Sequence, residues 1–189
     1  MVPSTQATEK CDLTVFNGID GFDGSNVKRP KVLVVDDDPG MREVLESILV
    51  TENVEVCSAI DGKDAVQKTL TLNPDLILLD IGMPKLNGLT FCKAVRAGTQ
   101  TRNIPIIIVT SLTARGRLEE CMEAGADDFV GKPFQIEDLL IRVRTMLKTA
   151  DVSDRVERIN QYILAVHDLH THPDSRIGER AAPNCSGGL

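Results

Sequence analysis

The stretch KVLVVDDDPG, residues 31–40, joins an apolar run directly to three consecutive aspartates and a Pro-Gly pair. The apolar run has the length and the branched side chains typical of a buried strand. Three adjacent carboxylates repel one another, so a folded chain places them together only at a cost in stability. A cation bound at this strand end would reverse that repulsion.

Five apolar runs alternate with five helical patterns between residues 30 and 149. The runs predicted to form strands are residues 32–35, 54–57, 76–79, 106–109 and a short run at 129–130. The clearest helical stripes run from Met41 to Leu49 and from Ile136 to Leu147, with apolar residues at i, i+3, i+4 and i+7. This alternation predicts an α/β fold, a doubly wound five-stranded parallel sheet with helices on both faces.

The composition favours one globular domain with extensions at both ends. The chain has 189 residues, of which 42% are hydrophobic and 3% aromatic, so we expect a core of Val, Ile and Leu. Residues 1–29 are polar and are predicted to be a flexible N-terminal arm. We place the domain at residues 30–149, an amphipathic helix at 150–172 and a loose tail at 173–189.

Charge and apolar patterning narrow the possible partners. A formal net charge of -7 argues against a general nucleic-acid binder, which needs a basic face. No run approaches the roughly 18 apolar residues of a membrane helix, and the first residues lack a signal-peptide pattern. Five scattered cysteines suit reduced thiols, to which we assign no role. We therefore expect a cytoplasmic protein that binds neither nucleic acid nor membrane.

Polar residues stand at the ends of the predicted strands. Asp36 and Asp37 follow the first strand, Asp80 the third, Thr110 the fourth and Lys132 the fifth. Active groups of an open parallel sheet gather at the carboxyl ends of its strands, so we expect these side chains to meet. Clustered carboxylates favour Mg²⁺, and a carboxylate beside Mg²⁺, a lysine and a hydroxyl is arranged to accept a phosphoryl group.

Four motifs, VVDDDP, DLILLDIGMP, IIIVTS and DDFVGKPF, occur in this order between residues 34 and 134. Together they resemble the receiver domain of bacterial two-component response regulators, over roughly residues 30–149. The resemblance implies a flavodoxin-like fold with the strand order 2-1-3-4-5. The amphipathic helix would follow this domain as a C-terminal helical extension.

The resemblance also implies a role for each acidic residue. Asp80 would be the phosphoacceptor. Asp37 would bind Mg²⁺ directly, and Asp36 would hold it mainly through water. The backbone carbonyl of Gly82 would also face the metal. Asp38 is followed by proline and is instead predicted to be the N-cap of the first helix.

Three further residues take roles from the same resemblance. Thr110 would bind the phosphoryl oxygens through its hydroxyl and move with them. Lys132 would pair with those oxygens, and the Lys132-Pro133 bond is typically cis in this family. Phe129 stands at a switch position that is often Tyr; a plain core aromatic is the alternative reading.

Two positions depart from the family pattern. Gly82 and Leu112 stand where family members often carry polar side chains that flank the water attacking the aspartyl phosphate. Neither residue can orient that water. We therefore expect slow self-dephosphorylation.

The C-terminal segment leaves alternatives open. Its apolar residues recur at alternating spacings of four and three, at Val152, Val156, Ile159, Ile163 and Val166. This pattern predicts an amphipathic helix that either pairs as a short coiled coil, including as a homodimer, or folds back on the domain. A metal site at His167, His170 and His172 is the less favoured reading of HDLHTHP, and solvated histidines the favoured one.

The function predicted is a Mg²⁺-dependent phosphorylation switch. A sensor histidine kinase or phosphotransfer protein would donate the phosphoryl group to Asp80. The chain would not be an enzyme, although it would assist its own phosphorylation and dephosphorylation. Residues 150–189 are too few for a DNA-binding domain, so we expect signalling through protein contacts, without a DNA-binding output domain, unless the chain is a fragment.

Two rival functions remain. One is a hydrolase with an aspartyl-phosphate intermediate, although Asp80 is followed by IGMP and not by a second carboxylate two residues on. The other is an interaction module that works without phosphorylation, which would normally lack one of the key residues.

Overall fold

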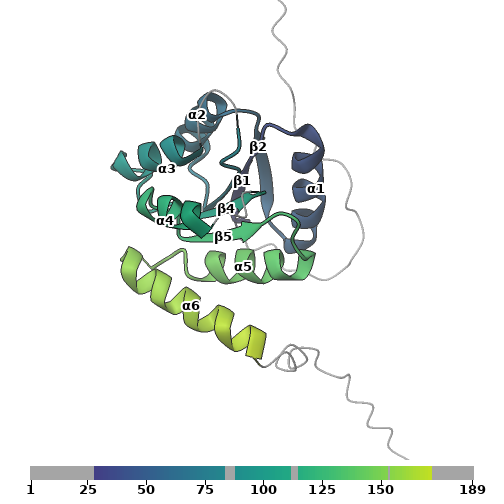
Figure 1. Ribbon diagram of the computed structural model, residues 1–189, viewed down its shortest axis with the longest axis vertical. Coiled ribbons are helices and arrows are strands. Elements are labelled where there is room, and N and C mark those ends of the chain that lie inside the picture. The colour runs from purple at the N-terminus through teal and green to yellow at the C-terminus, as the bar shows by residue number, and fades with distance from the viewer. Residues whose placement is uncertain (1–27, 84–87, 112–114, 153, 172–189) are drawn as a thin grey trace, which may run out of the picture.

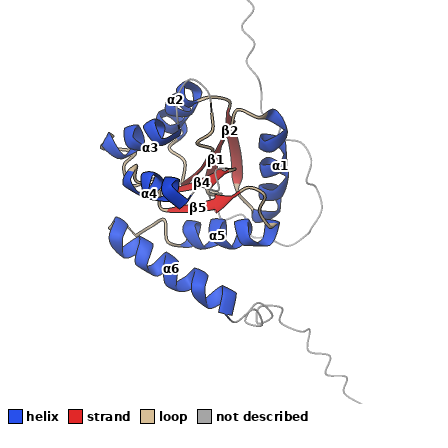
Figure 2. Cartoon of the chain, viewed as in Figure 1, coloured by secondary structure: helices blue, strands red, loops and turns tan. Residues whose placement is uncertain are grey.

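Five parallel strands form the centre of the molecule, in the order β2-β1-β3-β4-β5 (Figures 1 and 2). They are β1 (Lys31–Val35), β2 (Glu55–Ala59), β3 (Leu76–Leu79), β4 (Ile106–Thr110) and β5 (Asp128–Gly131). The computed structural model describes residues 28–83, 88–111, 115–152 and 154–171. The predicted fold class and strand order are confirmed. The tail predicted at 173–189 and nearly all of the arm lie outside the described residues.

Strand β2 lies slightly later than predicted, because its neighbour determines its length. The pairing with β1 runs in register from Lys31 opposite Glu55 to Val35 opposite Ala59. A run of apolar residues marks where a strand is buried, but strand pairing determines where it ends. Residues 58 and 59 therefore join the strand although the apolar run predicted ends at Cys57.

Helices cover both faces of the sheet (Figure 2). The chain order adds α1 (Pro39–Leu49), the short 3-10 turn η1 (Val50–Glu52), α2 (Gly62–Leu72), α3 (Gly88–Ala97), α4 (Arg115–Glu123), α5 (Ile136–Lys148) and α6 (Arg155–Thr171). Alternate strand residues face opposite sides, so Leu33 packs with residues of α2 and α3 while Val34 packs with α1 and α5. Every residue of β3 and β4 is buried, as expected for central parallel strands.

The predicted N-cap is confirmed at α1. The Asp38 carboxylate accepts a hydrogen bond of 2.9 Å from the backbone N–H of Gly40, and Pro39 occupies the first helical position. The third aspartate of the DDD run therefore starts a helix.

Helix α6 folds back on the domain and packs along α5 (Figure 1). This is the second of the two arrangements predicted for the segment. Its contacts differ from the predicted stripe. Val166 packs against the core, but Val156 is 69% and Ile163 57% exposed, while Tyr162 is buried. The stripe prediction is wrong at these two positions, because polar bonds to the domain set the rotation of the helix. Homodimerisation through α6 stays a prediction.

Among the described residues, no helix is both long and apolar enough to cross a membrane.

A buried carboxylate that the sequence did not single out joins α3, β4 and α6. The side chain of Asp127 is fully buried; its Oδ2 accepts bonds of 2.7 Å from Arg96 and from the backbone N–H of Ile106. Its Oδ1 accepts a 2.9 Å bond from Arg155. Burial lowers the pKa of the Arg96 guanidinium, and Asp127 opposes that effect. One carboxylate thus compensates cations from two helices.

We predict that Asp127→Ala lowers the free energy of unfolding by about 3–5 kcal/mol, because buried guanidinium groups lose their counter-charge. Urea unfolding of the full chain measures this. The matched control is Asp138→Ala, which removes a more exposed carboxylate paired with Arg142 one helical turn away and should cost under about 1 kcal/mol. Equal effects of the two substitutions would contradict the role assigned to Asp127.

Candidate functional site: an acidic cluster at the carboxyl edge of the sheet

Three carboxylates meet where β1 and β3 end. Val35 lies opposite Leu79 in register, so Asp36 and Asp80 leave adjacent strands at the same edge. The backbone N–H of Asp80 donates a 2.8 Å hydrogen bond to the carbonyl of Val35 and fixes this alignment. One oxygen each from Asp36, Asp37 and Asp80 lies within 4.8 Å of the others. The structure thus brings together the three acidic residues that the sequence predicted.

Lys132 reaches this cluster from the end of β5. Its Nζ lies 2.7 Å from Asp36 Oδ2 and 3.8 Å from Asp80 Oδ2, and its side chain is mostly buried. Its backbone N–H donates a 2.7 Å bond to the carbonyl of Thr110, the last residue of β4. The Lys132-Pro133 bond is cis, as the resemblance implied.

The three aspartates differ in surroundings and therefore in what they can do. Asp36 is buried: its Oδ1 accepts a 2.9 Å bond from the N–H of Asp38, and its Oδ2 holds Lys132. Both oxygens thus have a partner, which suits contact with a cation through water. Asp37 is exposed and Asp80 half-buried, so both are accessible to a ligand from solvent. Sequence reasoning missed Arg42. Its guanidinium donates a 2.7 Å hydrogen bond to the backbone carbonyl of Asp36 and so stabilises the chain where β1 ends.

The donor set fits a hard divalent cation. All the side-chain donors are carboxylate oxygens, and one ammonium among three carboxylates leaves an excess of negative charge. Gly82 lies close beside the Asp80 carboxylate: its backbone nitrogen is 3.2 Å from Oδ1, and an added Cβ would lie 3.2 Å from Oδ2. The direction of the Gly82 carbonyl toward a metal stays a prediction.

The remaining predicted residues take different places. Thr110 is buried at the end of β4, beside the lysine. Phe129 is 42% exposed on β5, so the reading as a plain core aromatic is wrong, and its role as a switch stays a prediction. Leu112 lies outside the described residues. Of the three histidines, His167 is exposed, and the other two side chains lie outside the described set.

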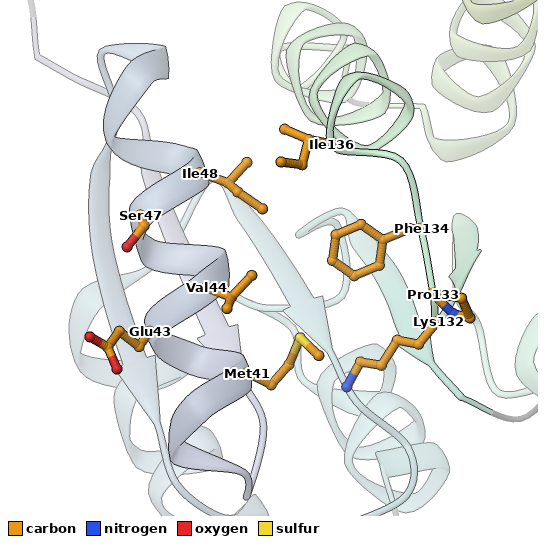
Figure 3. Close-up of a pocket in the computed structure, with 9 residues that line it drawn as sticks. All are labelled: Met41, Glu43, Val44, Ser47, Ile48, Lys132, Pro133, Phe134 and Ile136. Atoms are coloured by element: carbon orange, nitrogen blue, oxygen red, sulfur yellow. The ribbon is translucent and has the colours of Figure 1, made fainter.

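An apolar groove opens beside Lys132, between α1 and the start of α5 (Figure 3). It has a volume of about 530 Å³, and Met41, Val44, Phe134 and Ile136 line it. Figure 3 shows Lys132 and Met41 at the same end of the groove. Val44 and Ile136 belong to the predicted helical stripes, yet both are about half exposed. The stripes identified apolar positions but not that α1 and α5 leave these two uncovered.

Comparison with known protein families identifies the domain. A family model described as the response regulator receiver domain matches residues 32–144, more than half of the chain. Among solved structures, a response regulator from Chloroflexus aurantiacus is 35% identical, covering 64% of this chain and 99% of that one, with a TM-score of 0.62. The receiver domain of a sensor histidine kinase from Pseudomonas aeruginosa is 30% identical, covering 64% and 98%, with a TM-score of 0.60. That structure holds a magnesium ion in its active-site cleft.

Curated relatives correct one prediction. The DNA-binding dual master transcriptional regulator RpaA of Synechocystis is 35% identical over 80% of this chain and 60% of that protein. The DNA-binding response regulator MtrA of Mycolicibacterium smegmatis is 38% identical over 80% of this chain and 64% of that protein. The chain thus spans less than two thirds of these relatives. Our predictions of a regulator without a DNA-binding output domain, and without a nucleic-acid partner, are contradicted by them.

The reason for this error is physical. Net charge and segment length describe only the residues over which they are counted, whereas the matched regulators are longer than the stretch that aligns. An acidic receiver and a DNA-binding region can occur in one regulator, because each folds around its own core. The fold, the acidic cluster with its lysine, and the match over residues 32–144 agree. This chain belongs to the response regulator receiver domain family.

Proposed function

We propose that the chain is a phosphorylation switch in which Asp80 accepts a phosphoryl group from a sensor histidine kinase or phosphotransfer protein. The observation that carries this proposal is the meeting of Asp80 with Lys132 and two further carboxylates at one strand edge. Lys132 Nζ stands 3.8 Å from Asp80 Oδ2, beyond hydrogen-bonding distance, so it can shift toward a phosphoryl group on that oxygen.

The transfer is a direct displacement at phosphorus. An Asp80 carboxylate oxygen attacks, the new P–O bond forms, and the P–N bond of the donor phosphohistidine breaks with its electron pair left on the imidazole. Asp36, Asp37 and Asp80 would hold Mg²⁺, which neutralises charge on the transferring oxygens. Lys132 supplies a second positive charge. The backbone hydrogen bond from Lys132 to the carbonyl of Thr110 keeps Thr110, which carries the hydroxyl, beside the lysine.

The groove between α1 and α5 is where we place the donor protein. A donor must bring its phosphohistidine to Asp80, and the groove shares Lys132 with the site. Exposed apolar side chains at Val44 and Ile136 offer contact area for a helix of the donor.

The chain serves as the acceptor and promotes its own modification; it does not turn over a separate substrate. The DNA-binding relatives support control of transcription as the output of the whole regulator. The predicted cytoplasmic location is part of the same proposal.

Intact mass after treatment with acetyl phosphate and Mg²⁺ tests the acceptor. We expect wild type to gain one phosphoryl group and Asp80→Asn to gain none. Lys132→Met should slow the gain by about 10²-fold, because a preorganised donor to the developing charge is removed. Sustained turnover of a generic phosphoester would instead support the hydrolase, and no gain in wild type would contradict the proposal.

Divalent-metal binding has a separate test in thermal unfolding. Mg²⁺ at about 100 times its dissociation constant should stabilise wild type by about 2.7 kcal/mol, and Asp37→Asn should lose most of that gain. Asp38→Asn is the matched control, because it removes the same charge from the next position while asparagine still caps the helix. An unchanged melting temperature of wild type with Mg²⁺ would contradict a metal site here.

Slow loss of the phosphoryl group is expected in purified protein, because Gly82 offers no side chain to orient the attacking water. Gly82→Asn should speed the loss by about tenfold. Gly82→Ala is its control, since both variants place a Cβ about 3.2 Å from Asp80 Oδ2 and only asparagine adds a polar group. A wild-type half-life of only seconds, followed by intact mass, would refute the expectation.

A further inference from the structure

Helix α6 meets the domain through polar bonds at the start of β5. Arg155 donates to Asp127 Oδ1 at 2.9 Å and to the carbonyls of Gly125 and Ala126 at 3.0 and 2.8 Å. About two helical turns later, the Tyr162 hydroxyl donates to Asp128 Oδ2. The same oxygen accepts a 2.6 Å bond from Arg142 of α5. We call these domain residues, from Gly125 to Asp128 with Arg142, the α6 seat.

Between the bonds made by Arg155 and Tyr162, the hydrogen bonding of α6 to the domain is incomplete. Arg158 is only 1% exposed, yet its Nε and Nη2 have no hydrogen-bond partner among the described residues. Its Nη2 lies 3.8 Å from Asp127 Oδ1, which already receives Arg155. Burial lowers the pKa of the Arg158 guanidinium, as expected for a charge that has lost its water. Docking of α6 therefore buries a cation without fully compensating it.

The outward side of α6 is also unusual. Val156, Ile163 and Leu164 are 69%, 57% and 67% exposed, although an amphipathic helix normally buries such residues and exposes its arginines. The docked position thus buries an under-bonded arginine and leaves three large apolar side chains in water. The buried arginine weakens the docked state relative to a released one, in which its guanidinium regains water. The three apolar side chains are exposed in both states, so release leaves them free for a partner to cover.

The seat is joined to the phosphoacceptor site by a very short strand. Asp128 begins β5 and Gly131 ends it, and Lys132 follows directly. Tyr162 therefore holds one end of a strand whose other end carries the lysine of the site. In the coupling proposed below, the shift of Lys132 from Asp36 toward a phosphoryl group on Asp80 would displace the end of β5. The bonds that α6 makes to Asp127 and Asp128 would then lengthen.

We propose that α6 is an intramolecular latch, seated across β5 and α5 in the unphosphorylated protein and released when Asp80 gains its phosphoryl group. This inference rests on the proposed function. While seated, α6 covers one side of α5, so release uncovers that surface for an output partner (Figure 1). Linkage requires the reverse as well: opening the latch must favour binding of a phosphoryl group or its mimic.

Hydrogen exchange at the amides of residues 155–171, in the full chain, tests whether α6 is seated. Tyr162→Ala should lower their protection by about tenfold, because it removes the buried ring and its hydroxyl bond. Ile163→Ala is the matched control, since the neighbouring side chain is exposed and its loss should leave protection unchanged. Arg158→Met should raise protection, because it keeps the stem and removes the poorly bonded charge. An unprotected α6 in wild type overturns the latch.

Binding of beryllium fluoride with Mg²⁺, a non-covalent phosphoryl mimic, tests the coupling. Tyr162→Ala should bind at least about fivefold more tightly than wild type, Arg158→Met more weakly, and Ile163→Ala equally. The mimic should also lower α6 protection in wild type. Equal affinities in variants whose α6 protection differs overturn the coupling. If wild type binds no mimic and gains no phosphate, the proposed function itself has failed. If Tyr162→Ala does not fold, Tyr162→Phe and Arg158→Met carry the same comparison.

Discussion

The ion pair between Lys132 and Asp36 is the contact on which the site depends. It joins the end of β5 to the end of β1, across two intervening strands, and lies within a cluster of like charges. Without that ammonium the three carboxylates would face one another in a partly buried pocket. With it, one carboxylate has a fixed partner, and the other two remain for a cation and a phosphoryl group. Charge balance here is thus incomplete, and the excess of negative charge favours an incoming cation.

Much of this arrangement was predictable from sequence, because parallel sheets place strand ends at one edge. Apolar runs located β1, β3 and β4, and the residue after each strand then had to lie at that edge. The cap at Asp38 was predictable for a local reason, since aspartate followed by proline starts helices. The pairing of Lys132 with Asp36 rather than Asp80 was not predictable, because a difference of about an ångström decides it.

The least predictable features depend on long-range contacts. Asp127 and Asp128 look like any acidic pair before a strand, yet one is fully buried among arginines from α3 and α6. Nothing local marks it, since its partners lie about thirty residues away on either side. The rotation of α6 has the same origin. Heptad spacing predicted that Val156 and Ile163 would be covered, but bonds from Arg155 and Tyr162 turn that side outward.

Charges are therefore incompletely compensated at both ends of β5, with opposite signs in excess. At Lys132 an excess of carboxylates favours an incoming cation; at Asp127 an excess of guanidinium groups works against the helix that supplies two of them. Neither end is at its electrostatic optimum, and between them Val130 is buried while Phe129 is partly exposed. Only the four residues of β5 separate the two ends, which is the distance that a displacement would have to cross in the latch we propose. The marginal seating of α6 is what would allow so small a movement to have a large effect.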